Sequence, residues 1–140
     1  MLQRDDIAQI IEDYDRMKLR IGMTASHSAL DICDGGIEEG FPTVAYCQEG
    51  RHKTYANYFK TKRSSSGRVL RGMVDKAIVM PSFNDVMNDS MQVEMRKRNV
   101  VYIPNRSFTS YSSIEDVENK FRVPLFGSRN MLRMEAVSYT

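Results

Sequence analysis

The chain has 140 residues, a size typical of one domain and too short for two ordinary ones. Its 41% hydrophobic and 27% charged residues are ordinary for a soluble protein, and a formal net charge of +2 gives no general argument for binding nucleic acid or membranes. No apolar run approaches the length of a bilayer span, and the charged N-terminus is unlike a signal peptide. We therefore expect a cytoplasmic protein.

The cysteine and histidine pattern argues against a metal site. Cys33 and Cys47 are not part of a CxxC pair, and the two histidines are not spaced as partners for them. We expect both thiols to be reduced and packed in the core, and we predict no metal ligands.

Hydrophobic periodicity predicts the first elements. Apolar residues at helical spacing indicate a helix over 4–17, and a short strand follows at 19–24. A second helix is expected from about Ser28 to Asp34, with Gly35 and Gly36 ending it. A strand is predicted at 41–46.

The second half of the chain begins with a basic stretch. Residues 48–75 are rich in lysine and arginine, and the serines and glycine at 64–67 predict a flexible loop. A strand is expected at 77–80, a helix at 84–98 and a strand at 100–103. Alternating strands and helices predict an α/β fold with a parallel sheet and right-handed crossovers.

Two polar turns follow predicted strands. Residues 24–28 form the first strand-to-helix turn, where serine hydroxyls and helix N-terminal amides make a natural anion site. Residues 105–107 follow the last predicted strand, and the carboxyl ends of parallel strands share one rim. The first turn lacks the GxGxxG pattern, so a dinucleotide-binding fold is not predicted.

His27 and Ser107 are the candidate ligand contacts on these turns. His27 could donate to a phosphate or a heterocycle edge, or it could cap the helix or pack locally. Ser107 could bind the ligand or cap the segment after Pro104. No nucleophile–base–acid set, P-loop, HExxH motif or EF-hand loop is visible, so no catalytic residue is predicted.

The basic stretch 51–71 has two interpretations. With Tyr55, Tyr58 and Phe59 as stacking groups it could bind phosphate or nucleic acid. The interpretation that we favour is a solvated surface loop, because no recognised nucleic-acid motif accompanies it.

Several segments together resemble a known family. They are TASHSALDI (24–32), GGIEEGF (35–41), Gly50-Arg51 with Tyr55 and Phe59 downstream, PNRSFTSY (104–111) and DVENKFRVPLFGSRNMLRMEA (116–136). In this order they resemble the N-terminal domain of the archaeal formate-dependent 5-formaminoimidazole-4-carboxamide ribonucleotide synthetases, of the ATP-grasp superfamily. The resemblance implies a Rossmann-like, three-layer pre-ATP-grasp domain with a mostly parallel sheet, spanning residues 1–140.

The resemblance also implies a function. Family members use ATP to make formyl phosphate, which the amine of aminoimidazole-carboxamide ribonucleotide attacks, a step of purine (IMP) biosynthesis. The family's nucleotide-contacting histidine and serine correspond to His27 and Ser107. Ser26, Ser28 and Arg106 are further candidates for binding the ribonucleotide.

The sequence departs from the family in three places. Asn105-Arg106 replaces the family's His-Gly pair, Met134 replaces a tryptophan, and the loop at about 60–74 is longer. A glycine-to-arginine change adds a side chain where backbone could approach ligand.

The ATP-grasp portion, which supplies the ATP and magnesium sites, is absent from these 140 residues. We therefore expect ATP and Mg²⁺ only with that portion, as a further domain or a separate subunit, and no ligation by this chain alone. An exposed apolar patch is expected where the portion would dock, and a homo-oligomer is possible. The alternative hypothesis is a stand-alone, non-catalytic nucleotide-binding or regulatory module of the same fold.

Overall fold

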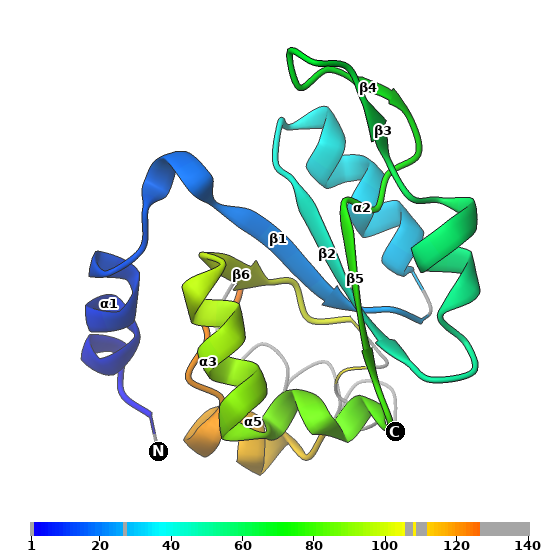
Figure 1. Ribbon diagram of the computed structural model, residues 1–140. Helices are drawn as coiled ribbons and strands as arrows, with labels where there is room; N and C mark the ends of the chain where they lie inside the picture. Colours follow the sequence, from blue (N-terminus) through cyan, green and yellow to red (C-terminus); the bar gives the residue numbers. More distant parts are fainter. Residues whose placement is uncertain (1, 27, 106–107, 109–111, 127–140) are drawn as a thin grey trace.

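The computed structural model describes residues 2–26, 28–105, 108 and 112–126. Its centre is a four-stranded parallel sheet with the order β5-β2-β1-β6 (Figure 1). The strands are β1 (Arg20–Thr24), β2 (Thr43–Gln48), β5 (Lys76–Met80) and β6 (Val100–Tyr102). All three pairings are parallel, which confirms the predicted α/β class and all four predicted strands.

Helices cover both faces of the sheet and make three layers. One face carries α2 (Ala29–Glu38), and the opposite face carries η3 (Phe83–Met87), α3 (Asp89–Lys97) and α5 (Ile114–Lys120) (Figure 1). Alternate residues of a strand point to opposite faces. In β2, Val44 and Tyr46 accordingly join the core under α3, while Ala45 and Cys47 join the core under α2.

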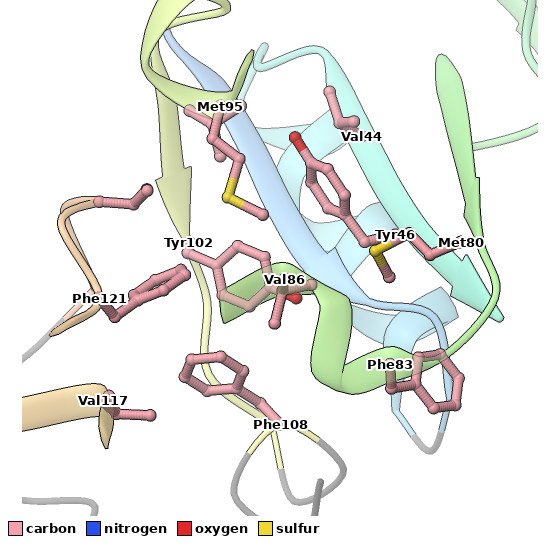
Figure 2. Packing of buried hydrophobic residues seen from close by; sticks show 12 residues of the cluster. Val44, Tyr46, Met80, Phe83, Val86, Met95, Tyr102, Phe108, Val117 and Phe121 are labelled. Atoms are coloured by element: carbon pink, nitrogen blue, oxygen red, sulfur yellow. The ribbon is translucent and has the colours of Figure 1, made fainter. Parts of the chain in front are cut away.

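The larger core contains an aromatic cluster around Tyr102, the last residue of β6 (Figure 2). The Tyr102 ring centroid lies 4.9 Å from that of Phe108, 5.4 Å from that of Phe121 and 5.8 Å from that of Tyr46. All four side chains are buried, so the end of β6 is held in a well-packed environment.

The predicted end of the second helix is wrong. α2 continues through Gly35 and Gly36 to Glu38, and Gly40, with φ of +86°, provides the left-handed residue after the helix. Phe41 N donates to Gly36 O at 2.8 Å and closes this C-terminal motif. A Cβ on Gly36 would lie 3.2 Å from Thr43 Cγ2, so this glycine allows the helix to pack closely on the sheet.

Two other predicted helices are interrupted. α1 (Arg4–Glu12) ends before Tyr14, and a separate 3₁₀ turn, η1 (Arg16–Lys18), follows in place of the predicted continuation to residue 17. Tyr14 is buried, and its hydroxyl donates to Val100 O at 2.7 Å, which draws the chain out of the helix. The helix predicted at 84–98 is divided into η3 and α3 by Asn88, whose backbone is extended.

The basic stretch 48–75 is not a simple loop. It contains a π-helical turn, η2 (Thr54–Tyr58), and an antiparallel hairpin of β3 (Lys62–Arg63) and β4 (Val69–Arg71). The serines and glycine predicted as a flexible loop form the hairpin turn, in which Gly67 N donates to Ser64 O at 2.9 Å. Figure 1 shows the hairpin beyond the C-terminal end of α2, away from the carboxyl ends of β2 and β5.

Candidate functional site

The strand order defines one position at the carboxyl ends of β1 and β6, and we call the two turns that follow these strands the crevice. The chain runs outward from β1 to β2 and β5, and then crosses back to add β6 on the other side of β1. This reversal is a topological switch point, where open α/β sheets characteristically bind ligands. Both polar turns predicted from the sequence follow strands that end here, so they share one rim as expected.

Hydrogen bonds from three elements hold the turn after β1. Ala25 N donates to Tyr46 O at 2.9 Å, which continues the pairing with β2. Ser26 N donates to Thr24 O at 2.9 Å, and the hydroxyl of Tyr55, from η2, donates to Ser26 O at 3.3 Å. Tyr55 itself is half-buried against the core under α2. These hydrogen bonds hold the backbone of residues 24–26 in place.

Ser28 stands at the start of α2 in an unusual conformation. Its φ of +69° lies in the left-handed region, which is uncommon for residues other than glycine and asparagine. Its side chain makes no capping hydrogen bond among the described residues, although serine at this position usually does. Ser28 is exposed, at a helix end that favours negative charge.

A buried hydrogen bond joins the ends of the two strands. Thr24 Oγ1 and the Tyr102 hydroxyl lie 2.6 Å apart, and both residues are buried. Burial raises the pKa of Tyr102, so its hydroxyl stays protonated and neutral at physiological pH. This contact joins the carboxyl ends of β1 and β6 inside the core.

The turn after β6 is tied to β1 by Asn105. Its side-chain Nδ2 donates to Thr24 O at 2.8 Å, and its Oδ1 accepts from Phe108 N at 3.0 Å. Asn105 departs from the family in the sequence, and no sequence pattern predicts this bridge. The Tyr55 and Tyr102 contacts were also missed, because no local sequence signal marks them.

The predicted site residues are described only in part. Ser26 and Ser28 lie on the turn after β1, at the rim. His27, Arg106 and Ser107 lie outside the described residues. Their roles remain predictions.

The basic residues of 51–71 do not form one patch. Arg51, His52 and Lys53 follow the carboxyl end of β2, whereas the β3–β4 hairpin is anchored at the amino ends of β2 and β5. The anchor is Asp75, which accepts from Arg63 Nε at 2.7 Å and from Thr43 N at 2.9 Å. The longer loop therefore lies at the opposite end of the sheet from the crevice.

Burial alone would raise the pKa of Asp75. Hydrogen bonds from Arg63, Thr43 N and Thr61, together with the Arg63 charge, outweigh burial and hold the pKa of this carboxyl below its usual value. Asp75 is therefore ionised at neutral pH and acts as a structural anchor.

A shallow groove of about 290 Å³ lies elsewhere, between α1 and α3. Its lining includes Tyr14 and Arg96, and Tyr14 is bonded to Val100 at the amino end of β6, so the groove is remote from the crevice. Within the part of the chain that the structure describes, no three histidine, cysteine or acidic side chains gather to hold a metal ion. Nor do these residues include a helix long and apolar enough to cross a bilayer.

The fold and the site define a class of protein, a Rossmann-like α/β domain with polar turns at its switch point. Residues 21–140 match the family described as "Protein of unknown function (DUF1246)", and the chain belongs to this family.

Named relatives support the resemblance seen in the sequence. The chain is 35% identical over 132 residues to a 5-formaminoimidazole-4-carboxamide-1-(beta)-D-ribofuranosyl 5'-monophosphate synthetase of Methanobrevibacter smithii, covering 94% of this chain and 33% of the relative. The Methanopyrus kandleri protein of the same name is 35% identical over 136 residues, covering 97% of this chain and 34% of the relative. The chain thus spans about a third of the length of these curated relatives.

A solved structure shares the fold. An IMP biosynthesis protein PurP from Thermococcus kodakaraensis superimposes with a TM-score of 0.60 at 29% identity, covering 83% of this chain and 32% of that one. The resemblance to the N-terminal domain of this synthetase family is confirmed by these matches and by the Rossmann-like fold.

Proposed function

We propose that this chain is the ribonucleotide-binding part of an ATP- and formate-dependent ligase that formylates aminoimidazole-carboxamide ribonucleotide in purine biosynthesis. The observation that carries the proposal is the pair of polar turns joined by Asn105 at the carboxyl ends of β1 and β6, where the sheet has its switch point. The names of the relatives supply the substrate class, since the product in those names is a ribonucleoside monophosphate.

The rim offers the groups that such a ligand needs. The start of α2 favours a negative charge, and the hydroxyls of Ser26 and Ser28 can donate to phosphate oxygens. We assign the nucleotide contacts to His27 and Ser107, as the family resemblance implies. Arg106 is the further candidate for the phosphate or the carboxamide, because a guanidinium binds phosphate with two parallel hydrogen bonds.

The ligation itself requires groups beyond these. In the family, ATP activates formate and Mg²⁺ neutralises the phosphates, and both belong to the ATP-grasp portion. The described residues do not gather carboxylates for a magnesium site, so we derive no step through the metal. We propose that the ATP-grasp portion, in the same polypeptide or in a separate subunit, completes the site in the cytoplasm.

The experiment is a titration of the chain with aminoimidazole-carboxamide ribonucleotide, followed by amide chemical shifts. The proposal predicts weak, saturable binding with the largest shifts at Ser26, Ser28 and Phe108. The matched ligand is the corresponding riboside without phosphate, which is expected to bind more weakly because it lacks the anion. Shifts confined to the α1–α3 groove, or equal affinities for the two ligands, would contradict the assignment.

The same titration distinguishes the alternative. A stand-alone regulatory module of the same fold would bind a different nucleotide at this crevice. Saturable binding of another nucleotide, together with no response to the ribonucleotide at millimolar concentration, would favour that module over the ligase.

A further inference from the structure

We infer that Asn105 is a positioning residue that sets the separation of the two turns at the crevice. The relevance of Asn105 to ligand binding rests on the proposed function. The geometry of its hydrogen bonds does not depend on that proposal. Nδ2 donates to Thr24 O on the β1 side, and Oδ1 accepts from Phe108 N on the β6 side. One planar amide therefore spans both turns.

Asn105 continues the hydrogen-bond ladder of the sheet beyond its last strand residue. Ile103 N donates to Gly22 O at 2.8 Å, which is a regular rung between β6 and β1. Carbonyls two residues apart point to the same side of a strand, so Thr24 O points toward β6 as Gly22 O does. The next hydrogen bond of the ladder would therefore come from residue 105. The side-chain amide of Asn105 donates to that carbonyl and holds the chain at the sheet after Pro104.

The amide is suited to this position because it carries a donor and an acceptor at a fixed spacing. An aspartate in the same place has only acceptors at neutral pH and would face Thr24 O with a negative charge. The bond to Phe108 N, by contrast, needs only an acceptor. Replacing Asn105 by Asp thus breaks the link to β1 and preserves the link within the second turn.

Both ends of the bridge border candidate ligand residues. Thr24 O also accepts from Ser26 N at 2.9 Å, so the same carbonyl bonds to the first turn and to Asn105. In the sequence, His27 follows Ser26, and Arg106 and Ser107 stand between Asn105 and Phe108. A shift of the bridge is expected to displace the two sets of ligand groups relative to one another.

The test compares N105D with N99D in the 140-residue chain. Asn99 lies at the opposite end of β6, and its Oδ1 accepts from Asp15 N at 3.0 Å, an interaction that aspartate can also make. N105D is expected to accelerate amide hydrogen exchange at Ser26 about tenfold, the loss expected for one hydrogen bond of ordinary net strength, while Phe108 N keeps its acceptor and its protection. N99D is expected to leave exchange at both amides unchanged.

Binding gives the second readout. Affinity for aminoimidazole-carboxamide ribonucleotide is expected to fall about tenfold in N105D and to be unchanged in N99D. A wild-type exchange rate at Ser26 in N105D, or equal changes at Ser26 in both variants, would overturn the inference. If the wild type does not bind the ribonucleotide, the proposed function fails while the exchange data still decide the role of Asn105. Should N105D not fold, N105A removes the same bridge without adding charge.

Discussion

Replacing Asp75 by asparagine tests how the basic hairpin is anchored. The carboxylate accepts four hydrogen bonds, from Thr43 N at 2.9 Å, Thr61 Oγ1 at 2.8 Å, Arg63 Nε at 2.7 Å and Arg63 Nη2 at 2.8 Å. Asparagine keeps the shape but loses the charge, and its NH₂ group cannot accept. Each carboxylate oxygen accepts two of these bonds, so two donors then lose their acceptor.

The stability that D75N is expected to lose depends on the burial of Asp75 and on the number of its hydrogen-bond partners. A hydrogen bond to a charged group contributes about 1.5–3 kcal/mol, but the contributions of one network do not add. The side chains of Asp75 and Arg63 are 16% and 34% exposed, which reduces the electrostatic part through screening. We expect a loss of about 3 kcal/mol in the free energy of unfolding, or a fall in Tm of roughly 10 °C for a domain of this size.

The contribution of Asp75 to the free energy of unfolding falls as the pH is lowered. The folded pKa of Asp75 is depressed, so its contribution is fully present above the unfolded carboxyl pKa of about 4 and is lost as pH falls through the folded value. The difference in stability between the wild type and D75N should therefore be largest at neutral pH and shrink below about pH 4.

Urea unfolding at pH 7 and pH 3 provides the assay. The control is E94Q, which removes the Arg98–Glu94 pair at 3.0 Å on the surface of α3 and should cost less than about 0.5 kcal/mol. Ribonucleotide affinity should be the same in D75N as in the wild type, because Asp75 lies at the opposite end of the sheet. A D75N variant as stable as E94Q at pH 7 would show that the Asp75 carboxylate does not anchor the hairpin.

Three further predictions concern packing, strain and reactivity. G22A should lower the free energy of unfolding by about 2–3 kcal/mol in urea titrations, because the added Cβ would lie 2.6 Å from Val100 Cγ1; unchanged stability would contradict this packing. S28G should raise Tm by a few degrees through relief of the left-handed conformation and weaken ribonucleotide binding through loss of the hydroxyl; a lower Tm would count against the strain. Cys33 and Cys47 are buried, and burial raises the pKa of each thiol to about 12. Neither thiol should therefore react with a thiol reagent at pH 8 until the chain is denatured. Rapid labelling of the native chain would show that the thiols are accessible.

The strands of the sheet were predictable because each is a short apolar run bounded by turn residues. The helix end at Gly35-Gly36 was mispredicted because a glycine pair is a strong local stop signal. In the folded chain Gly36 instead supplies close packing against Thr43 and Ile21, which only the tertiary structure reveals. The hairpin was missed because its strands are two and three residues long.

The rim was predictable from topology, and its internal geometry was not. Parallel strands bring their carboxyl ends together, so the sequence placed the two turns on one edge. The bridge from Asn105 to Thr24 joins residues 81 positions apart, and no local pattern marks such a contact. The division of the basic stretch likewise depends on Asp75, whose partner Thr43 is 32 positions away.

We propose that the crevice between β1 and β6 binds a ribonucleotide through His27. The chain has two histidines, so H52A provides a matched control for H27A. His52 accepts from Gly50 N at 3.3 Å in the turn after β2. Calorimetric titration with aminoimidazole-carboxamide ribonucleotide is the direct measurement. We expect saturable binding by the wild type and by H52A, and loss of binding in H27A. Equal affinities of H27A and H52A for the ribonucleotide would contradict a role for His27 in binding.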